Sequence, residues 1–220
     1  TTTTLTLATR HSNDTTTTTT TTPPPTTTPT VAIADLKRLL IAADQISTIM
    51  GGSAMMAEPV QENMFDDAAN MSEHECVGTW LPAQAATYTG SGWDAVEAQE
   101  LRAPDGQLWQ HGAIQSVVGF PSPQAAQKFL TAQITAWKAC AAKRFTITPP
   151  GSPAQQWTFG QFSTVDDTSS MTLTMDGFAG SCQRAISARS NVVIDVTACQ
   201  NDATNQAGTI VHDIAAKITQ

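Results

Sequence analysis

Two groups of polar side chains have the types and spacing to do chemistry. The first contains Arg184 and Asp195, which lie on either side of Ser190-Asn191 in a stretch bounded by two cysteines. An arginine near an aspartate can form a structural ion pair or contact a charged ligand. We interpret the pair first as a structural salt bridge and second as a ligand contact.

The second group surrounds Asp105-Gly106, a dipeptide typical of tight hairpin turns. With these two residues as the turn, Arg102 faces Trp109 and Glu100 faces His111 on one side of a sheet. A face that mixes charges with aromatic rings can bind a polar ligand by hydrogen bonds and stacking. An ordinary solvent-exposed face has the same pattern, so both interpretations stay open.

Catalytic and metal-binding motifs are absent from the sequence, including nucleophile elbows, zinc-protease motifs, phosphate-binding loops and kinase signatures. The run Glu73-His74-Glu75-Cys76 contains ligand types, but alternate residues of a strand point to opposite faces, so we interpret it as an exposed loop. We interpret Asp66-Asp67 and Asp166-Asp167 as solvated turns. We therefore predict no catalytic residue, no metal site and no cofactor.

The four cysteines, Cys76, Cys140, Cys182 and Cys199, allow three disulfide pairings. A two-residue turn at Ser190-Asn191 places Cys182 opposite Cys199 on a non-hydrogen-bonded pair, with Cα atoms about 4.5 Å apart. That distance suits a disulfide, and the remaining pair is Cys76–Cys140. Persistent disulfides favour an extracytoplasmic location over a cytosolic protein with four free thiols.

The elements that must position these residues follow from periodicity and turn signals. The sequence predicts helices over 34–50, 123–143 and 203–219, a short helix over 82–88 and the end of a strand in the run 76–82 that Cys76 opens. It also predicts a hairpin over 93–120 and a four-stranded meander over 155–199. This order predicts an α+β fold, in which about three helices cover one face of an antiparallel sheet stapled by two disulfides.

Residues 1–30 differ in composition from the predicted domain over 31–220. They are rich in threonine and proline, with an unbroken threonine run at 15–22, which predicts a disordered stalk or linker open to O-glycosylation. The net charge of −8, with only 11 Lys and Arg residues, argues against binding to nucleic acid. No apolar run reaches the length of a membrane helix, so we expect any membrane tether to lie outside this chain.

Spaced motifs across the predicted domain carry a family resemblance. They are Leu39-Leu40, Ile49-Met50-Gly51, Cys76, Trp80-Leu81-Pro82, Tyr88, Gly90-Ser91-Gly92-Trp93, Gln115-Ser116-Val117-Val118-Gly119-Phe120, Trp137-Lys138-Ala139-Cys140, Cys182-Gln183-Arg184-Ala185, Asn191-Val192-Val193-Ile194-Asp195-Val196 and Cys199. Together they resemble the extracellular sensor domain of mycobacterial PknH-type Ser/Thr receptor kinases, which also occurs in mycobacterial lipoproteins. The resemblance implies an antiparallel sheet packed by helices and disulfides paired first to second and third to fourth, as the register also predicts.

The resemblance further implies a solvent-exposed cleft for an unidentified ligand, whose binding outside the cell would regulate a kinase inside it. We expect a non-catalytic sensor domain for a small-molecule or cell-wall ligand. The alternative is a cell-envelope lipoprotein or secreted protein with a structural or carrier role. The candidate ligand-binding residues are Tyr88, Trp93, Arg102, Trp109, Arg184 and Asp195.

Overall fold

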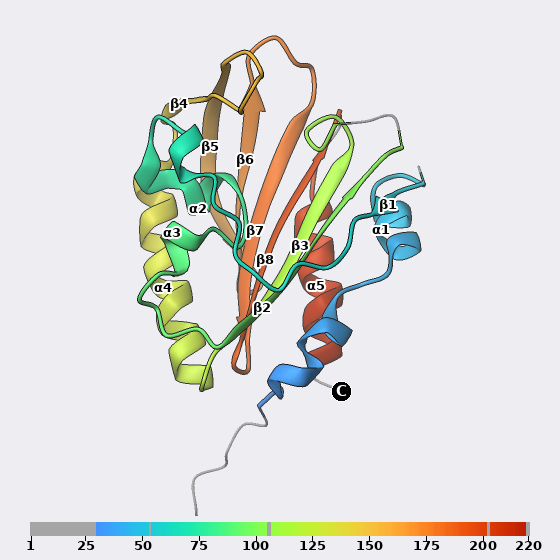
Figure 1. Cartoon of the computed structure of the whole chain (residues 1–220), viewed down its shortest axis with the longest axis vertical. Helices are drawn as coiled ribbons and strands as arrows, with labels where there is room; N and C mark the ends of the chain where they lie inside the picture. The colour runs from blue at the N-terminus through green and yellow to red at the C-terminus, as the bar shows by residue number, and fades with distance from the viewer. Residues whose placement is uncertain (1–29, 53, 105–106, 202, 219–220) are drawn as a thin grey trace, which may run out of the picture.

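The computed structural model describes residues 30–52, 54–104, 107–201 and 203–218, which form one eight-stranded sheet with helices packed on it (Figure 1). Its strands pair antiparallel in the order β1-β2-β3-β8-β7-β6-β5-β4. The strands are β1 (Met56–Ala57), β2 (Ala95–Arg102), β3 (Gly112–Gly119), β4 (Arg144–Ile147), β5 (Gln155–Val165), β6 (Thr168–Met175), β7 (Ser181–Arg189) and β8 (Val192–Gln200). The predicted α+β class and antiparallel sheet are confirmed.

Helices cover both faces of this sheet. They are the 3₁₀ helices η1 (Ile33–Leu39), η2 (Ala68–Asn70) and η3 (His74–Cys76), and the α-helices α1 (Ala43–Ile49), α2 (Val77–Trp80), α3 (Ala85–Tyr88), α4 (Pro123–Cys140) and α5 (Gln206–Ile218). One face, which we call the α4 face, lies under α2, α3 and α4; η1, α1 and α5 pack on the other, the α5 face (Figure 1). The prediction of helices on one face is therefore wrong. Strand β8 shows why, because all its residues except the last are buried and both its faces need cover.

The β7–β8 hairpin has the predicted register. Cys182 pairs with Cys199 and Arg189 with Val192, and Ser190 adopts a positive φ of 51° in the turn between them. Both predicted disulfides are present, Cys182–Cys199 between the two strands and Cys76–Cys140 between η3 and the end of α4. The hairpin thus forms the middle of the sheet, with β3 on one side and β6 on the other.

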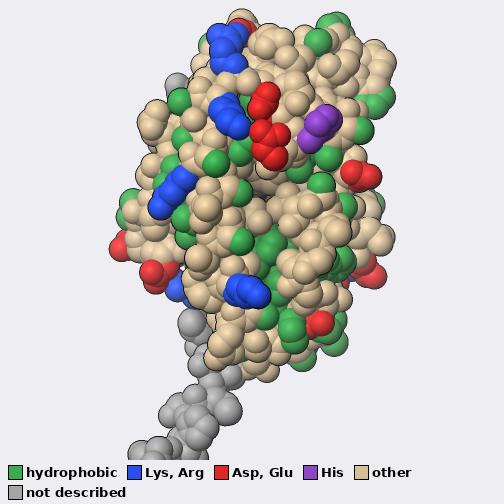
Figure 2. Space-filling view, turned by 90° about the vertical axis from the view of Figure 1, so that its left-hand side faces the viewer, with side chains coloured by type: hydrophobic (Ala, Val, Ile, Leu, Met, Phe, Trp, Pro, Cys, Tyr) green, Lys and Arg blue, Asp and Glu red, His purple; other side chains and the backbone are tan. Residues whose placement is uncertain are grey.

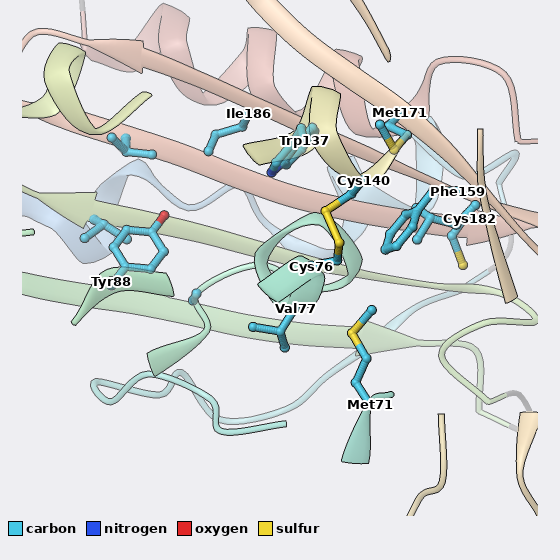
Figure 3. Packing of buried hydrophobic residues seen from close by; sticks show 14 of the residues in the cluster. Met71, Cys76, Val77, Tyr88, Trp137, Cys140, Phe159, Met171, Cys182 and Ile186 are labelled. Atoms are coloured by element: carbon cyan, nitrogen blue, oxygen red, sulfur yellow. A yellow bond between two sulfur atoms is a disulfide. The ribbon is translucent and has the colours of Figure 1, made fainter. Parts of the chain in front are cut away.

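The core of the α4 face is built around the Cys76–Cys140 disulfide (Figure 3). Helix α4 begins as predicted: the Ser122 hydroxyl accepts a hydrogen bond from the backbone N–H of Ala125 at 3.1 Å, and Pro123 occupies the first turn. Trp137 and Cys140 then point from α4 into the core (Figure 3). The disulfide therefore holds η3 and α2 against α4.

Three local predictions are wrong. The helix expected over 34–50 is two helices, because the buried side chain of Gln115 bonds both the N–H and the carbonyl of Ile41 and holds the chain extended between them. Cys76 ends a 3₁₀ helix that continues into α2, where a strand was expected. Strand β4 was not predicted; Met71 bridges to Ile147 on its outer side.

The β2–β3 hairpin also has a different register from the predicted one. Arg102 lies opposite Gly112 and Glu100 opposite Ile114, so Trp109 and His111 belong to the connection between the strands. The Asp-Gly dipeptide at 105–106, on which the two-residue turn was predicted, lies outside the described residues. A connection of this length removes Trp109 and His111 from the ladder and leaves their side chains free to pack elsewhere.

Candidate ligand-binding cleft

A cleft of about 520 Å³ lies at one end of the α4 face. Ile114 of β3 and Cys199 of β8 line it from the sheet, so the Cys182–Cys199 disulfide is part of its lining. Glu100 and Arg102 enter from β2, at one side of the sheet, and Trp157 from β5, at the other. The cleft therefore spans strands that are far apart in sheet order, and Trp80 at the end of α2 lines it as well.

Aromatic side chains make up much of the cleft wall: Phe65, Trp80, Trp109 and Trp157. Trp157 is 3% exposed, whereas Trp80 and Trp109 are half-buried. Phe145 holds two of them in place, since its ring centroid lies 6.5 Å from that of Trp80 and 6.4 Å from that of Trp157. These rings offer a ligand rigid apolar surface at little entropic cost.

The polar side chains of the cleft are Asp67, Asn70, Glu100, Arg102 and Gln107. Arg102 donates from Nη2 to Oε1 of Glu58 at 2.8 Å in a solvent-exposed ion pair. Partial burial raises the pKa of Glu100; Arg102 opposes this effect, and Glu58 and Asp67 add to it. A few convergent polar groups on an apolar surface are typical of small-molecule sites.

A second set of polar and aromatic residues lies where α2, α3 and α4 meet the sheet. We call Arg184 and Asp195 of the sheet, Tyr88 of α3 and Trp137 of α4 the buried network. The side chain of Arg184 is 0% exposed and that of Asp195 4%, and Arg184 Nη2 lies 2.6 Å from Asp195 Oδ1. Arg184 also donates to the carbonyls of Gly78 and Val196, and its guanidinium lies 5.0 Å from the centroid of the Trp137 ring. The charge of Arg184 is thus paired, hydrogen-bonded and stacked.

The other oxygen of Asp195 is also satisfied. Its Oδ2 accepts hydrogen bonds from the hydroxyl of Tyr88 and the N–H of Ala83, both at 3.1 Å. The Tyr88 ring stacks on Phe129 of α4, with centroids 4.3 Å apart. Burial and the adjacent carboxylate raise the pKa of Tyr88 well above its ordinary value. The network therefore fastens the chain around α2 and α3 to the sheet.

The structure divides five of the six predicted ligand-binding residues between these two places and puts the sixth, Trp93, in neither. Arg102 and Trp109 line the cleft. Tyr88, Arg184 and Asp195 form the buried network, and Trp93 is partly buried against the core outside the cleft lining. Arg184 and Asp195 are the diagonal neighbours that the register predicted, and their ion pair supports the structural interpretation.

Sequence reasoning missed several cleft residues, notably Trp80, Trp157 and Asp67. Asp67, interpreted as part of a solvated turn, accepts a hydrogen bond from Gln84 and lines the cleft. The alternation of Trp157 with Phe159 could have placed Trp157 on the inner face of its strand. Nothing in the sequence indicated that this face would meet Glu100.

The run Glu73-His74-Glu75-Cys76 forms contacts within the protein. Glu73 and Glu75 lie 3.7 and 3.1 Å from the ammonium of Lys143, and Cys76 is in a disulfide. Figure 2, which shows the side of the molecule where α2, α3 and α4 lie, has basic, acidic and histidine side chains interspersed. In the described ranges, no group of three or more His, Cys, Asp or Glu side chains is placed to hold a metal ion. The cleft is therefore the stronger candidate site.

Comparison with known proteins agrees with this architecture. A family model described as the PknH-like extracellular domain matches residues 31–217. The chain belongs to this family.

Its relatives include serine/threonine-protein kinases of mycobacteria. The chain is 32% identical over 191 residues to the serine/threonine-protein kinase PknH of Mycobacterium bovis and to that of Mycobacterium tuberculosis. The match covers 86% of this chain but only 32% and 30% of those kinases, so the chain spans about a third of their length. The kinase domains of these relatives lie outside the match.

The fold is also shared with a solved structure, that of the extracellular domain of PknH from Mycobacterium tuberculosis. The two structures superpose with a TM-score of 0.82 at 32% identity, covering 87% of this chain and 98% of the other. The PknH-like domain with its two disulfides is consistent with an extracytoplasmic location. Within the described segments, no helix has both the length and the apolar character needed to cross a bilayer.

Proposed function

We propose that this PknH-like domain is a non-catalytic, extracytoplasmic ligand-binding sensor, with the cleft as its ligand site and a membrane-linked Ser/Thr kinase as the receiver of its signal. The observation that carries the proposal is the cleft itself, where three tryptophans meet a half-buried glutamate and an arginine. Its volume of about 520 Å³ suits a small molecule or one end of a cell-wall fragment.

The position of Trp80 offers a route by which a ligand could affect the rest of the domain. Trp80 lines the cleft at the end of α2, two residues after Gly78, whose carbonyl accepts a hydrogen bond from Arg184 at 2.9 Å. A ligand that moves Trp80 would therefore act on α2, which the buried network and the Cys76–Cys140 disulfide both hold. Such a coupling requires the ligand to prefer one arrangement of α2 over another.

The experiment is a thermal-shift screen of the isolated domain against fractionated cell-wall extracts, since a ligand of the native state raises the midpoint of unfolding. The active fraction is then tested on Trp109→Ala and Arg102→Ala, with Lys128→Ala as a control on the exposed side of α4. We expect both cleft variants to lose the ligand-induced rise above their own ligand-free midpoints, and Lys128→Ala to respond like the original domain. Equal shifts in all variants would show that the ligand binds outside the cleft.

The alternative, an envelope protein with a structural or carrier role, predicts the same fold and a different parent protein. The sequence encoded upstream of Thr1 separates the two. A kinase domain followed by one membrane helix supports the sensor, whereas a lipobox cysteine supports the carrier.

A further inference from the structure

Glu100 is the one charged group of the cleft without a close partner of its own in the described part of the chain. Its carboxylate is half-buried, and the charges that act on it are Arg102, Glu58 and Asp67. Arg102 is held by its ion pair with Glu58, at 2.8 Å, and Asp67 accepts a hydrogen bond from Gln84 at 3.0 Å. Glu100 is therefore available to a ligand.

The charges around Glu100 favour a cationic ligand over an anionic one. Arg102 is the sole basic residue in the described lining, against the carboxylates of Glu100 and Asp67, and Glu58 adds a third beside Arg102. An anion entering the cleft would face this excess of negative charge in a partly desolvated site. A cation would provide the counter-charge that Glu100 lacks.

The aromatic walls favour the same ligand. Trp80 and Trp109 are half-buried in the lining, and the indole ring is the strongest cation–π partner among side chains. A compact ammonium head fills only part of about 520 Å³. Trp157, Ile147, Pro149 and Pro150 also line the cleft and form a surface suited to an apolar body.

We propose that the cleft binds an organic cation, a quaternary or protonated amine whose head pairs with Glu100 between Trp80 and Trp109 and whose apolar body lies against Trp157. This inference rests on the proposed function in one respect, that the cleft is the ligand site. It adds the chemical class of the ligand.

The test compares two probes of the same shape, choline and 3,3-dimethylbutan-1-ol, which differ in the charge of the trimethylated centre. Dissociation constants are measured by NMR titration of the isolated domain at low ionic strength. We expect choline to bind about tenfold more tightly than the alcohol, the ratio that a partly desolvated cation–π contact and ion pair provide. Added salt should weaken the binding of choline more than the binding of the alcohol.

Two cleft variants and a charge-matched control locate the effect. Glu100→Gln should bring the two dissociation constants within about threefold of each other, because the counter-charge is gone while the shape is kept. Trp109→Ala should weaken the binding of both probes. Glu97→Gln removes one charge from the opposite face of the same strand, outside the cleft, and should leave the ratio unchanged.

The outcomes separate this inference from the proposed function. If the alcohol binds as tightly as choline and both need Trp109, the cleft is a ligand site but not one for cations. If neither probe binds, or if choline binds equally well to Glu100→Gln, the cation inference is wrong. The cell-wall screen with Trp109→Ala then still decides whether the cleft is the sensor site.

Discussion

The cleft and the buried network use similar side chains on the same face of the sheet, but they leave these side chains in different electrostatic states. In the network, Arg184 and Asp195 are dry, and both carboxylate oxygens are hydrogen-bonded. In the cleft, Arg102 is exposed and the half-buried carboxylate of Glu100 has no hydrogen bond or ion pair with any residue that the structure describes. The fully hydrogen-bonded carboxylate of Asp195 serves the structure, although Arg184 Nε and Trp137 Nε1 in the same network have no hydrogen-bond partner among the described residues. A carboxylate without such partners in an open cavity is instead available for binding.

Helix α2 joins the two regions. Its Gly78 carbonyl belongs to the network, and its last residue, Trp80, lines the cleft. Each region also contains one disulfide, Cys76–Cys140 beside the network and Cys182–Cys199 at the cleft. If the contrast is correct, changes in the network should mainly alter stability, and changes in the cleft should mainly alter binding.

The largest effect is expected from Arg184→Met. It leaves Asp195 charged and buried without its counter-ion, and breaking such a pair costs about 3–5 kcal/mol. Urea denaturation measures the loss. The double variant Arg184→Met with Asp195→Asn should recover part of it, because the amide can still accept from Tyr88 and Ala83 without a buried charge. A loss below about 1 kcal/mol would show that water reaches the pair.

Removal of either disulfide comes next. The cysteines are 64 residues apart in Cys76–Cys140 and 17 apart in Cys182–Cys199. In the chain-entropy model, replacing both cysteines by alanine costs roughly 4 kcal/mol for the first pair and roughly 3 for the second. Chemical denaturation of the two double-alanine variants checks the order. The reverse order would mean that strain or residual unfolded structure outweighs loop length.

Tyr88 gives an intermediate effect with its own spectroscopic signal, because it is the only tyrosine in the chain. Since its pKa is raised in the folded state, the hydroxyl stays protonated there, and stability falls as the pH rises above about 10, the ordinary tyrosine value. Absorbance at 295 nm should therefore show no tyrosinate until the domain unfolds. Tyr88→Phe should cost about 2 kcal/mol at neutral pH, through loss of a hydrogen bond to a charged group. Titration near pH 10 in the folded domain would place Tyr88 in contact with water.

The smallest effect on stability is expected from Glu100→Gln, which should stabilise the domain where the preceding substitutions destabilise it. Partial burial raises the pKa of Glu100, so the folded state favours the protonated form. Stability is therefore lost as the pH rises from the ordinary glutamate value, about 4.3, to the raised pKa of the folded state. Glu100→Gln should therefore stabilise the domain at pH 7 by less than about 1 kcal/mol, because solvent still screens the charge. The gain should vanish below about pH 4, where glutamate is protonated in both states. Thermal unfolding of the variant and of the original domain at the two pH values measures this gain. Destabilisation at pH 7 would mean that Glu100 supports the fold, as the residues of the buried network do.

Local sequence signals predicted the parts of the fold that depend on short-range geometry. The Ser190-Asn191 turn set the pairing of β7 with β8, because register is counted outward from a turn. The same reasoning gave the wrong register at Asp105-Gly106, where the connection between the strands is longer than the predicted turn. A turn dipeptide is thus informative only when the loop contains no further residues.

The sequence by itself determined the two disulfides, the start of α4 and the diagonal placement of Arg184 and Asp195. The Cys182–Cys199 bond, the helix start and the diagonal pair follow from local register or capping, and Cys76–Cys140 is the pair of cysteines that remains. Only the tertiary structure decided what those residues do. Tyr88 and Asp195 are 107 residues apart in sequence and share one hydrogen bond. Glu100 and Trp157 come from strands near opposite edges of the sheet, β2 and β5, and line one cleft. Burial depends on which distant segments cover a side chain, so the same charge and aromatic pattern became a dry network at one place and an open cleft at the other.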